Sequence, residues 1–418
     1  MRIATAHAYD ASIQNLQKRQ QDLAESQMQL TSGKRVNSAS DDPTAAARAE
    51  RALASIARSD ANKRSLDASR NVMNITESAL GDTVELMQTA RETLVAAGNG
   101  TYSDGERKAL ATKLREIRNQ LLSVANRPDG GGGFVFGGQG SATPPFVDGN
   151  TGVTFVGQGG ETLASSSEKL NLTVDGDQVW LKARSGNGVF TTAQGTNANT
   201  SGPNSGTGWI TSGTVTAPSQ LPYPTPSGGS SPSYSVRFNV SGGTTTYDVL
   251  DNSTAPATTL SSGQPYNSGR TIDITGKGMS VSIAGAPADG DRFTIGEATN
   301  NLNMFSSLDK TIAALSQTNA PSSSIQQAVN TGMTEIDSVL GNVQAARSAV
   351  GESLNRMDGI ESRIETLKLA AATEKSNAED LDMTEAISNF QNRQTGYQAA
   401  LQSYASVQKL SLFQYING

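Results

Sequence analysis

Apolar residues recur every seven positions at both ends of the chain, a spacing that places them on one face of an α-helix. Near the N-terminus this stripe comprises Tyr9, Leu16, Leu23 and Leu30. It predicts a helix over about 6–31 that ends at Gly33, because glycine readily adopts the left-handed turn that closes many helices. Asp42 directly before Pro43 favours a new helix, since aspartate caps the first turn and proline needs no hydrogen-bond partner there.

Two longer apolar stripes predict long helices over about 44–97 and about 325–375, and a shorter helix is expected over about 104–126. The stripe of the second long helix holds six positions at constant heptad spacing, so this helix should run unbroken. We expect the two stripes to pack together as the core of a helical rod. Its predicted core residues are Leu66, Met73, Leu80, Met87, Leu94, Val329, Ile336, Val343, Val350, Met357 and Ile364.

A last helix is predicted over about 379–412, and polar breaks at 32–43 and near 373–380 separate both terminal helices from the long ones. The terminal residues expected to mediate self-assembly and partner binding are Tyr9, Leu16, Leu23, Leu30, Ile387, Phe390, Tyr397, Leu401, Tyr404, Leu410, Leu412 and Phe413. Such narrow stripes allow two outcomes. The terminal helices pack as a hairpin within one chain, or they are disordered in the monomer and become ordered on assembly. Their many Gln and Ala residues favour the second outcome.

The composition changes sharply near residues 130 and 298. The range 141–298 holds 11 of the 14 Pro and 24 of the 42 Gly, but only 7 of the 33 Lys and Arg. Apolar and polar residues alternate in several short runs between turn residues, which is typical of strands in a sandwich or small barrel. The predicted strands are 170–174, 179–181, 234–240 and 279–283, and 195–232 is expected to be a long flexible loop.

These patterns predict a mainly α fold with a β-rich insert. A long antiparallel helical bundle or coiled coil, built from both chain ends, is interrupted by a projecting β-sandwich or barrel-like domain. We expect three parts. Residues 1–43 and 376–418 form the terminal helices, disordered when monomeric, residues 44–140 and 299–375 form the long-helix rod, and residues 141–298 form the insert.

The chemistry of the chain argues against catalysis. There is no cysteine, and the single histidine, His7, lies in the predicted N-terminal helix, so we do not expect a His-based catalytic triad. The glycine run 130–133 lacks the Lys-Ser/Thr of a phosphate loop. The Asp-Gly-Asp sequences at 175–177 and 289–291 are most typical of hairpin turns. We therefore expect a protein that is not an enzyme and has no cofactor or metal site.

Charge and hydropathy exclude further classes. The formal net charge of −6 provides no basic face for nucleic acid. No apolar run approaches the roughly 20 residues of a membrane span, and residues 1–20 lack the apolar segment of a cleaved signal peptide. An exported chain of this kind needs another export route, and the absence of cysteine suits a chain that travels unfolded.

Both ends of the chain carry a recognisable signature. The segment QLTSGKRVNSASDDP at 29–43 resembles the N-terminal signature of the flagellin superfamily, and 382–387 and 407–416 resemble its C-terminal region. The opening residues 1–5 and the Asp-Asp-Pro ending look more like the junction proteins of that superfamily than like filament flagellin. The resemblance covers about 1–150 and 285–418, including GFVFGG at 133–138, and is absent from the insert.

The resemblance implies a secreted structural subunit of the bacterial flagellum at the hook–filament junction, exported unfolded by the flagellar type III apparatus. The terminal helices would line the core of a tube as a concentric coiled coil. The implied partners are further copies of the chain in a ring, hook-associated protein 1, flagellin, and an export chaperone on the C-terminal helix.

Two other functions remain open at this level. The chain could be filament flagellin itself, with its helical ends forming the bulk filament. Alternatively, the insert could bind glycans or a host surface. The aromatic residues that motivate the second idea, if exposed, are Trp180, Trp209, Tyr223 and Tyr234.

Overall fold

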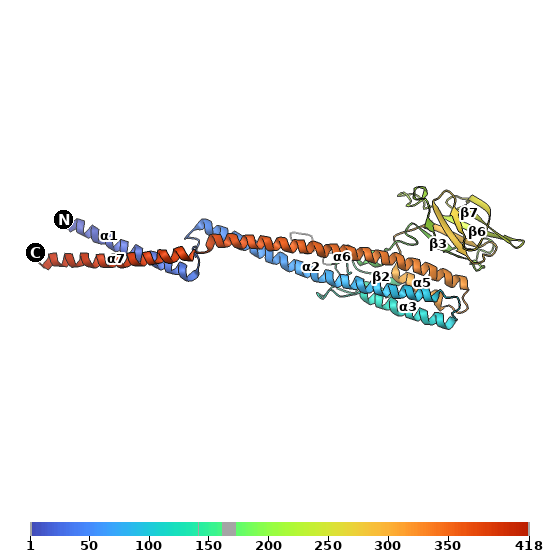
Figure 1. The fold of residues 1–418 in the computed structure, drawn as a ribbon, viewed down its shortest axis with the longest axis horizontal. Coiled ribbons are helices and arrows are strands. Elements are labelled where there is room, and N and C mark those ends of the chain that lie inside the picture. The colour runs from blue at the N-terminus through green and yellow to red at the C-terminus, as the bar shows by residue number, and fades with distance from the viewer. Residues whose placement is uncertain (1, 141, 161–172, 417–418) are drawn as a thin grey trace. The chain divides into compact units, whose positions relative to one another are not determined.

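The computed structural model describes residues 2–140, 142–160 and 173–416, and the chain divides into two compact units. The first unit consists of Met1–Arg64 and Gly359–Gly418, and the second of Ser65–Asp358. Both contain parts of the two longest helices, α2 (Pro43–Ala97) and α6 (Ser322–Glu379), as Figure 1 shows.

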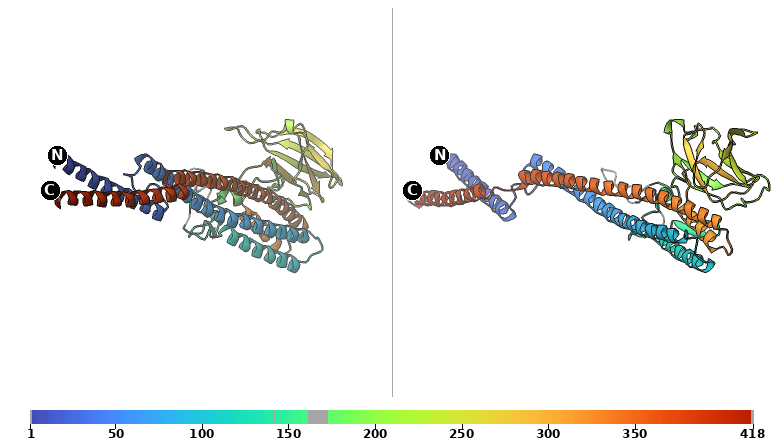
Figure 2. Two further views of the ribbon diagram at one scale, coloured as in Figure 1. Left: turned by 60° about the vertical axis from the view of Figure 1, so that its left-hand side comes forward. Right: turned by 45° about the vertical axis from the view of Figure 1, so that its right-hand side comes forward.

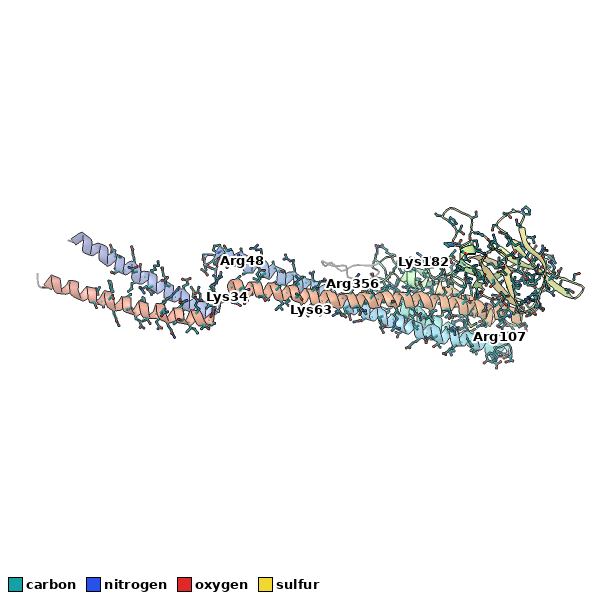
Figure 3. All side chains as sticks on the ribbon, turned by 45° about the horizontal axis from the view of Figure 1, so that its top comes forward. Lys34, Arg48, Lys63, Arg107, Lys182 and Arg356 are labelled. Atoms are coloured by element: carbon teal, nitrogen blue, oxygen red, sulfur yellow. The ribbon has the colours of Figure 1, made fainter. Side chains whose placement is uncertain are left out.

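In the first unit, α1 (Arg2–Ser32) packs against α7 (Met383–Ile416). The two helices are antiparallel, and the Arg393 guanidinium on α7 donates a hydrogen bond of 2.8 Å to the carbonyl of Asp22 on α1. The first part of α2 lies against the last part of α6, where Lys63, labelled in Figure 3, pairs with Glu361. The pairing of α1 with α7 within one chain corresponds to the first of the two outcomes considered for the terminal helices, the hairpin. Disorder of these helices in the monomer stays a prediction.

In the second unit, α2 and α6 are joined by a ladder of ion pairs between side chains that stand opposite one another. Arg91 pairs with Asp337 at 2.8 Å and Glu77 with Arg347 at 2.6 Å. Residue numbers rise along α2 as they fall along α6, so the helices are antiparallel. Ten of the eleven predicted rod-core residues lie in this unit, and Ile364 lies in the first. All eleven are at most 7% exposed, because heptad spacing keeps each on the buried face.

Two shorter helices, α3 (Asp104–Ala125) and α5 (Met304–Ser316), pack against each other in this unit. The views of Figure 2 show α3 running alongside α2. Ser103 begins α3 with a capping box, in which its side chain accepts from the Glu106 amide and Glu106 accepts from the Ser103 amide.

The described residues of the insert form three antiparallel sheets. A hairpin pairs β1 (Phe146–Gly149) with β2 (Gly152–Phe155). The order of the five-stranded sheet is β3 (Phe190–Gln194), β11 (Arg292–Glu297), β6 (Tyr234–Ser241), β7 (Thr244–Asp251) and β8 (Thr258–Pro265). In the four-stranded sheet, β10 (Met279–Ala284) pairs with β4 (Trp209–Ile210), β5 (Thr214–Val215) and β9 (Thr271–Ile274).

The four- and five-stranded sheets share one apolar core. Phe238 and Phe293 of the larger sheet lie in the same buried cluster as Ile210 and Ile283 of the smaller one. The rings of Phe238 and Phe293 meet edge to face, 5.9 Å apart. The predicted fold class, mainly α with a projecting β-sandwich-like insert, is therefore confirmed.

Some strand predictions are confirmed and others are wrong. Strands are present at 234–240 and 279–283, as parts of β6 and β10. Residues 179–181 are not a strand: Val179 and Trp180 end the short helix α4 (Gly176–Trp180), because Asp175 caps its first turn through the Asp177 amide. Of 170–174, residues 170–172 lie outside the described residues and 173–174 belong to no strand.

The expected loop over 195–232 is also wrong as stated, since it contains β4, β5 and the short 3-10 helix η1 (Pro218–Gln220). Buried Asp291 helps to hold this segment in place. One carboxylate oxygen of Asp291 accepts hydrogen bonds from the side-chain amide of Asn197 and the backbone N–H of Ser205. The other oxygen accepts a hydrogen bond from the backbone N–H of Gly206. The segment 195–232 is rich in Gly, Ser and Pro, but hydrogen bonds to Asp291 hold part of it in place. Asp291 is distant in the sequence, so residue spacing does not predict this contact.

An aromatic cluster joins the insert to the helices of this unit. Trp180 is fully buried; its ring stacks on Phe305 of α5 and meets Phe136 edge to face, with centroids 6.2 and 5.4 Å away. Arg118 of α3 lies over the Phe305 ring and forms ion pairs with Asp148 of β1 and Asp309 of α5. The Arg118 guanidinium lowers the pKa of Asp148, because it donates hydrogen bonds to the charged carboxylate.

Candidate assembly surface

The apolar residues of α1 and α7 differ from those of the rod core in how far they are buried. Leu16, Leu23, Leu30, Phe390, Tyr397 and Tyr404 are only half-buried. Ile387 and Leu401 are 46% and 39% exposed. Among the described side chains of the two helices only Ser26 is buried. Tyr9, Leu410, Leu412 and Phe413 were also predicted, but they lie outside the part of the two helices whose side chains the structure describes.

The predicted assembly residues leave out three exposed apolar residues on these helices. Ile13, Met28 and Met383 are 38%, 61% and 47% exposed. Ile13 lies three residues before Leu16, and Met383 lies four residues before Ile387, so both are helical neighbours of the predicted stripes. A search at spacings of three and four, in addition to seven, finds these two. Met28 fits no such spacing to the predicted residues.

The geometry of two helices explains the incomplete burial. Each helix can bury only the face that it turns toward the other, which is a narrow part of its circumference. An apolar face wider than that contact needs further helices around it, as in a bundle or a tube. The paired helices α1 and α7, which we call the terminal helix pair, therefore present apolar surface suited to assembly.

The two polar breaks that bound the terminal helix pair lie side by side. The Arg35 amide donates to the Glu379 carbonyl at 2.7 Å, and the Leu381 amide donates to the Gly33 carbonyl at 3.0 Å. The side chains of Lys34, labelled in Figure 3, and Glu379 form an ion pair of 3.0 Å. Gly33 has a φ of +70°, the left-handed conformation in which a helix ends most easily at glycine.

Asp41 and Asp42 of the signature segment have different structural roles in the first polar break, at 32–43. Asp41 accepts from the Asn37 and Ser38 amides and so closes the loop on itself. Asp42 caps α2 by accepting from the Ala45 and Thr44 amides, and it pairs with Arg35. The hydrogen bond from the Ala45 amide is the main reason that the pKa of Asp42 lies below its ordinary value of 3.8.

Removing this cap is expected to loosen the start of α2. In Asp42→Ala the Thr44 and Ala45 amides lose their acceptor, so their hydrogen exchange should become faster, while Glu50→Ala, which removes an exposed carboxylate from the same helix, leaves it unchanged. Because the folded pKa of Asp42 is lowered, its stabilising effect is present above pH 3.8 and is lost as the pH falls through the lowered pKa. Equal exchange in both variants at neutral pH would contradict the cap.

The described residues contain no group of three or more His, Cys, Asp or Glu side chains placed to hold a metal ion. Among the described helices, none is both long and apolar enough to cross a membrane.

Two family models match the chain. The bacterial flagellin N-terminal helical region matches residues 3–141, and the bacterial flagellin C-terminal helical region matches residues 333–416. Together they cover more than half of the chain and include the terminal helix pair and most of the long helices. The unmatched part contains the β-rich insert, where the sequence signature is also absent.

Individual relatives give a finer comparison. Flagellar hook-associated protein 3 of Salmonella typhimurium is 36% identical over 154 residues, which are 35% of this chain and 46% of that protein. The protein of the same name from Escherichia coli is 23% identical over 99% of both chains. The crystal structure of FlgL from Xanthomonas campestris matches with a TM-score of 0.66 and 28% identity, over 78% of this chain and 99% of that one.

The fold and both terminal signatures thus define a flagellar structural protein, and the chain belongs to the flagellin superfamily. Hook-associated protein 3 of Escherichia coli matches over 99% of both chains, whereas the phase 1 flagellin of Salmonella naestved matches over only 27% of this chain and 22% of its own length. The chain accordingly groups with the hook-associated protein 3, or FlgL, family.

Proposed function

We propose that this chain is a structural subunit of the bacterial flagellum that joins the hook to the filament. The observation that carries the proposal is the contrast in burial between the two sets of apolar residues. The rod core is closed within the chain, whereas Ile387 and Leu401 of the terminal helix pair remain open to solvent. Neighbouring subunits in the axial tube supply the missing apolar faces.

Assembly through these helices is conditional. A half-buried leucine gains free energy only when a neighbour covers its remaining surface, at roughly 25 cal/mol for each Å² removed from water. Ordering and orienting a subunit consumes much of this gain, so a single contact is weak and several together are stable. Such a subunit stays soluble during export and joins the structure where several neighbours are already in place.

The partners follow from the position at the junction. Further copies of the chain form a ring, hook-associated protein 1 contacts it on the hook side, and flagellin contacts it on the filament side. An export chaperone covers the C-terminal helix before secretion, and the working location is the extracellular flagellum. The role is structural, in keeping with the names of its relatives.

The two alternatives are weaker. Filament flagellin is not favoured, because the relative matched over 99% of both chains is named hook-associated protein 3, and a matching crystal structure from Legionella pneumophila is described as the flagellar junction protein FlgL. The glycan-binding alternative relied on exposed aromatic residues, but Trp180, Tyr223 and Tyr234 are at most 5% exposed. Trp209 is half-buried in β4, so the four residues do not form an aromatic surface.

Deletion of the gene in its own host separates the junction role from the filament role. A junction subunit leaves cells with hooks but no filaments, and intact flagellin appears in the medium. Electron microscopy and immunoblotting of the medium measure both outcomes, with cells that carry the gene on a plasmid as the control. Filaments on the hooks of the deletion strain would refute the proposed role.

A further inference from the structure

A stripe of uncharged polar residues on α6 makes hydrogen bonds to the backbone of α4, Arg184 and β4. Of these contacts, the one to β4 reaches the β-rich domain, by which we mean the two-sheet part of the insert from β3 to β11. Gln327, Asn330, Ser338 and Asn342 are separated by three, eight and four residues, which places them on one face of the helix. Each makes a hydrogen bond to backbone groups of the insert. The side-chain amide of Asn342 donates to the Gln178 and Val179 carbonyls at 2.8 and 2.9 Å, and the Ser338 hydroxyl donates to the Arg184 carbonyl.

The central contact is at Ile210 in β4. The Ile210 amide donates to Oε1 of Gln327 at 2.9 Å, and Nε2 of Gln327 donates back to the Ile210 carbonyl at 3.2 Å. Nδ2 of Asn330 donates to the same carbonyl at 3.1 Å. β4 pairs with β10 on one side only, so the Gln327 side chain occupies the place that a peptide group of the next strand would take. We call this contact the amide latch.

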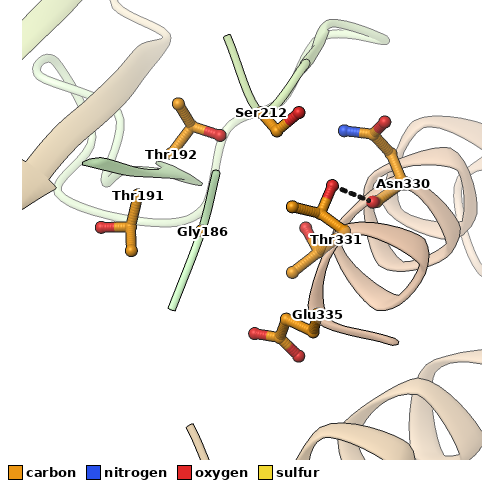
Figure 4. A pocket seen from close by; sticks show the side chains of 8 residues that line it. Gly186, Thr191, Thr192, Ser212, Asn330, Thr331 and Glu335 are labelled. Carbon is orange, nitrogen blue, oxygen red and sulfur yellow. Dashed lines mark hydrogen bonds between the residues drawn. The ribbon is translucent and has the colours of Figure 1, made fainter. Parts of the chain in front are cut away.

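A small cavity lined by polar side chains lies beside the latch. Figure 4 shows Thr191, Thr192 and Ser212 of the β-rich domain on one side, and Asn330, Thr331 and Glu335 of α6 on the other. Hydroxyl, amide and carboxylate groups can exchange their hydrogen bonds with water. Opening this part of the contact therefore exposes groups whose hydrogen bonds water can replace.

The chain passes between the helices and the β-rich domain through two neighbouring segments. Ala183 and Leu302 form an antiparallel bridge, and the Ser185 amide donates to the Thr299 carbonyl at 2.9 Å. The Ala298 amide donates to the Val189 carbonyl at 3.1 Å. These two paired segments form a neck, about which the domain can turn without either segment being stretched.

Separate cores lie on the two sides of the neck. The buried cluster of the β-rich domain runs from Phe190 to Ile295 and contains no residue of the helices. The seam between α2 and α6 is closed by its own side chains, such as Leu94 and Val343. A movement of the domain about the neck leaves both buried clusters intact.

We propose that the β-rich domain is a hinged body that turns about the 183–189 and 298–302 neck and is held against α6 by the amide latch on Ile210. Opening of the latch frees the domain while both cores stay folded. The amide latch sets the orientation of the β-rich domain relative to α6. It does so through hydrogen bonds between uncharged side chains of α6 and the backbone of Ile210, so it does not depend on the side chains of the insert.

Hydrogen exchange in the full chain tests the latch directly. In the unmodified protein the Ile210 amide should exchange faster than the Val236 and Val249 amides of the five-stranded sheet, because latch opening needs less free energy than unfolding of the domain. Replacing both latch side chains, as Gln327→Met with Asn330→Leu, should accelerate exchange at Ile210 by about tenfold or more. Val236 and Val249 should be unaffected.

A distance measurement tests the movement itself. The chain has no cysteine, so Glu92→Cys on α2 and Thr259→Cys on β8, both exposed, give two unique positions for spin labels. The distribution of label distances should broaden in the latch variant. The matched control, Gln344→Met with Asn355→Leu, changes the same residue types at exposed positions of α6 and should keep the narrow distribution.

Three results would overturn the proposal. In the first, Ile210 exchanges no faster than Val236 and Val249 in the unmodified chain, a comparison that does not require the variant to fold. In the second, all three amides accelerate equally in the latch variant, which indicates loss of the domain core. In the third, the distances of the latch variant remain as narrow as those of the control.

Discussion

Aspartate at three exposed apolar positions of the terminal helix pair, Ile13, Ile387 and Leu401, is expected to abolish filament attachment while the chain itself stays folded. These side chains are 38–46% exposed, so a charge there remains hydrated in the solitary chain. In the assembled tube the same charges would be covered by neighbouring subunits without a partner, which is strongly unfavourable. Cells carrying the triple variant should therefore secrete flagellin without attaching it to the hook.

Swimming assays, electron microscopy and flagellin content of the medium measure this effect. The matched control, Gln20→Asp with Gln391→Asp and Gln402→Asp, adds the same charge to exposed polar positions of the same helices. It should retain substantially more assembly. Circular dichroism of the purified triple variant should show the helix content of the unmodified chain. A triple variant that supports normal filaments would remove the terminal helix pair as the assembly surface.

Replacing Trp180 by alanine is expected to produce the largest loss of stability from a single residue outside the terminal helices. The indole is fully buried between Phe305 and Phe136, and a large-to-small change in a packed core costs about 3–5 kcal/mol. The aromatic cluster also joins α4 to α5, so its loss should loosen the contact between insert and helices.

Chemical denaturation followed by circular dichroism measures the change in the free energy of unfolding. Trp209→Ala serves as the control, because Trp209 is the only other tryptophan and is half-buried. It should cost clearly less than Trp180→Ala. The Trp180 fluorescence of the Trp209→Ala protein also reports on the cluster directly. Equal losses in the two variants would show that the cluster does not contribute the expected stability.

The helical part of the fold could be predicted from the sequence because its signal is local and repeats. Residues such as Leu80 and Val343 recur every seven positions, and that period alone places them on one buried face. The ends of the helices were predicted to within a few residues, since Gly33 and Asp42 carry recognisable cap chemistry. The candidate assembly residues on α1 and α7 came from the same period.

The insert was predicted less well because its order depends on contacts between distant residues. Val179 and Trp180 are residue types that favour strands, but the Asp175 cap and the aromatic cluster make them helical. The segment after residue 195 looks like a loop until Asp291, almost a hundred positions later, supplies its hydrogen bonds. The amide latch could not be predicted from the sequence either, because Gln327 lies on α6 and Ile210 on β4, far apart along the chain.

The neck at Ala183 and Leu302 has a consequence for how such chains can vary in length. The chain leaves the helical part at Ala183 and returns at Leu302, and these two residues are paired with each other. The helical part is therefore affected by the distance between these two residues, but not by the size of the domain inserted between them. An unrelated module with closely spaced ends, such as an epitope tag or a reporter, could be grafted at this point. A shortened chain closed by a turn between the two segments should likewise retain its helical part.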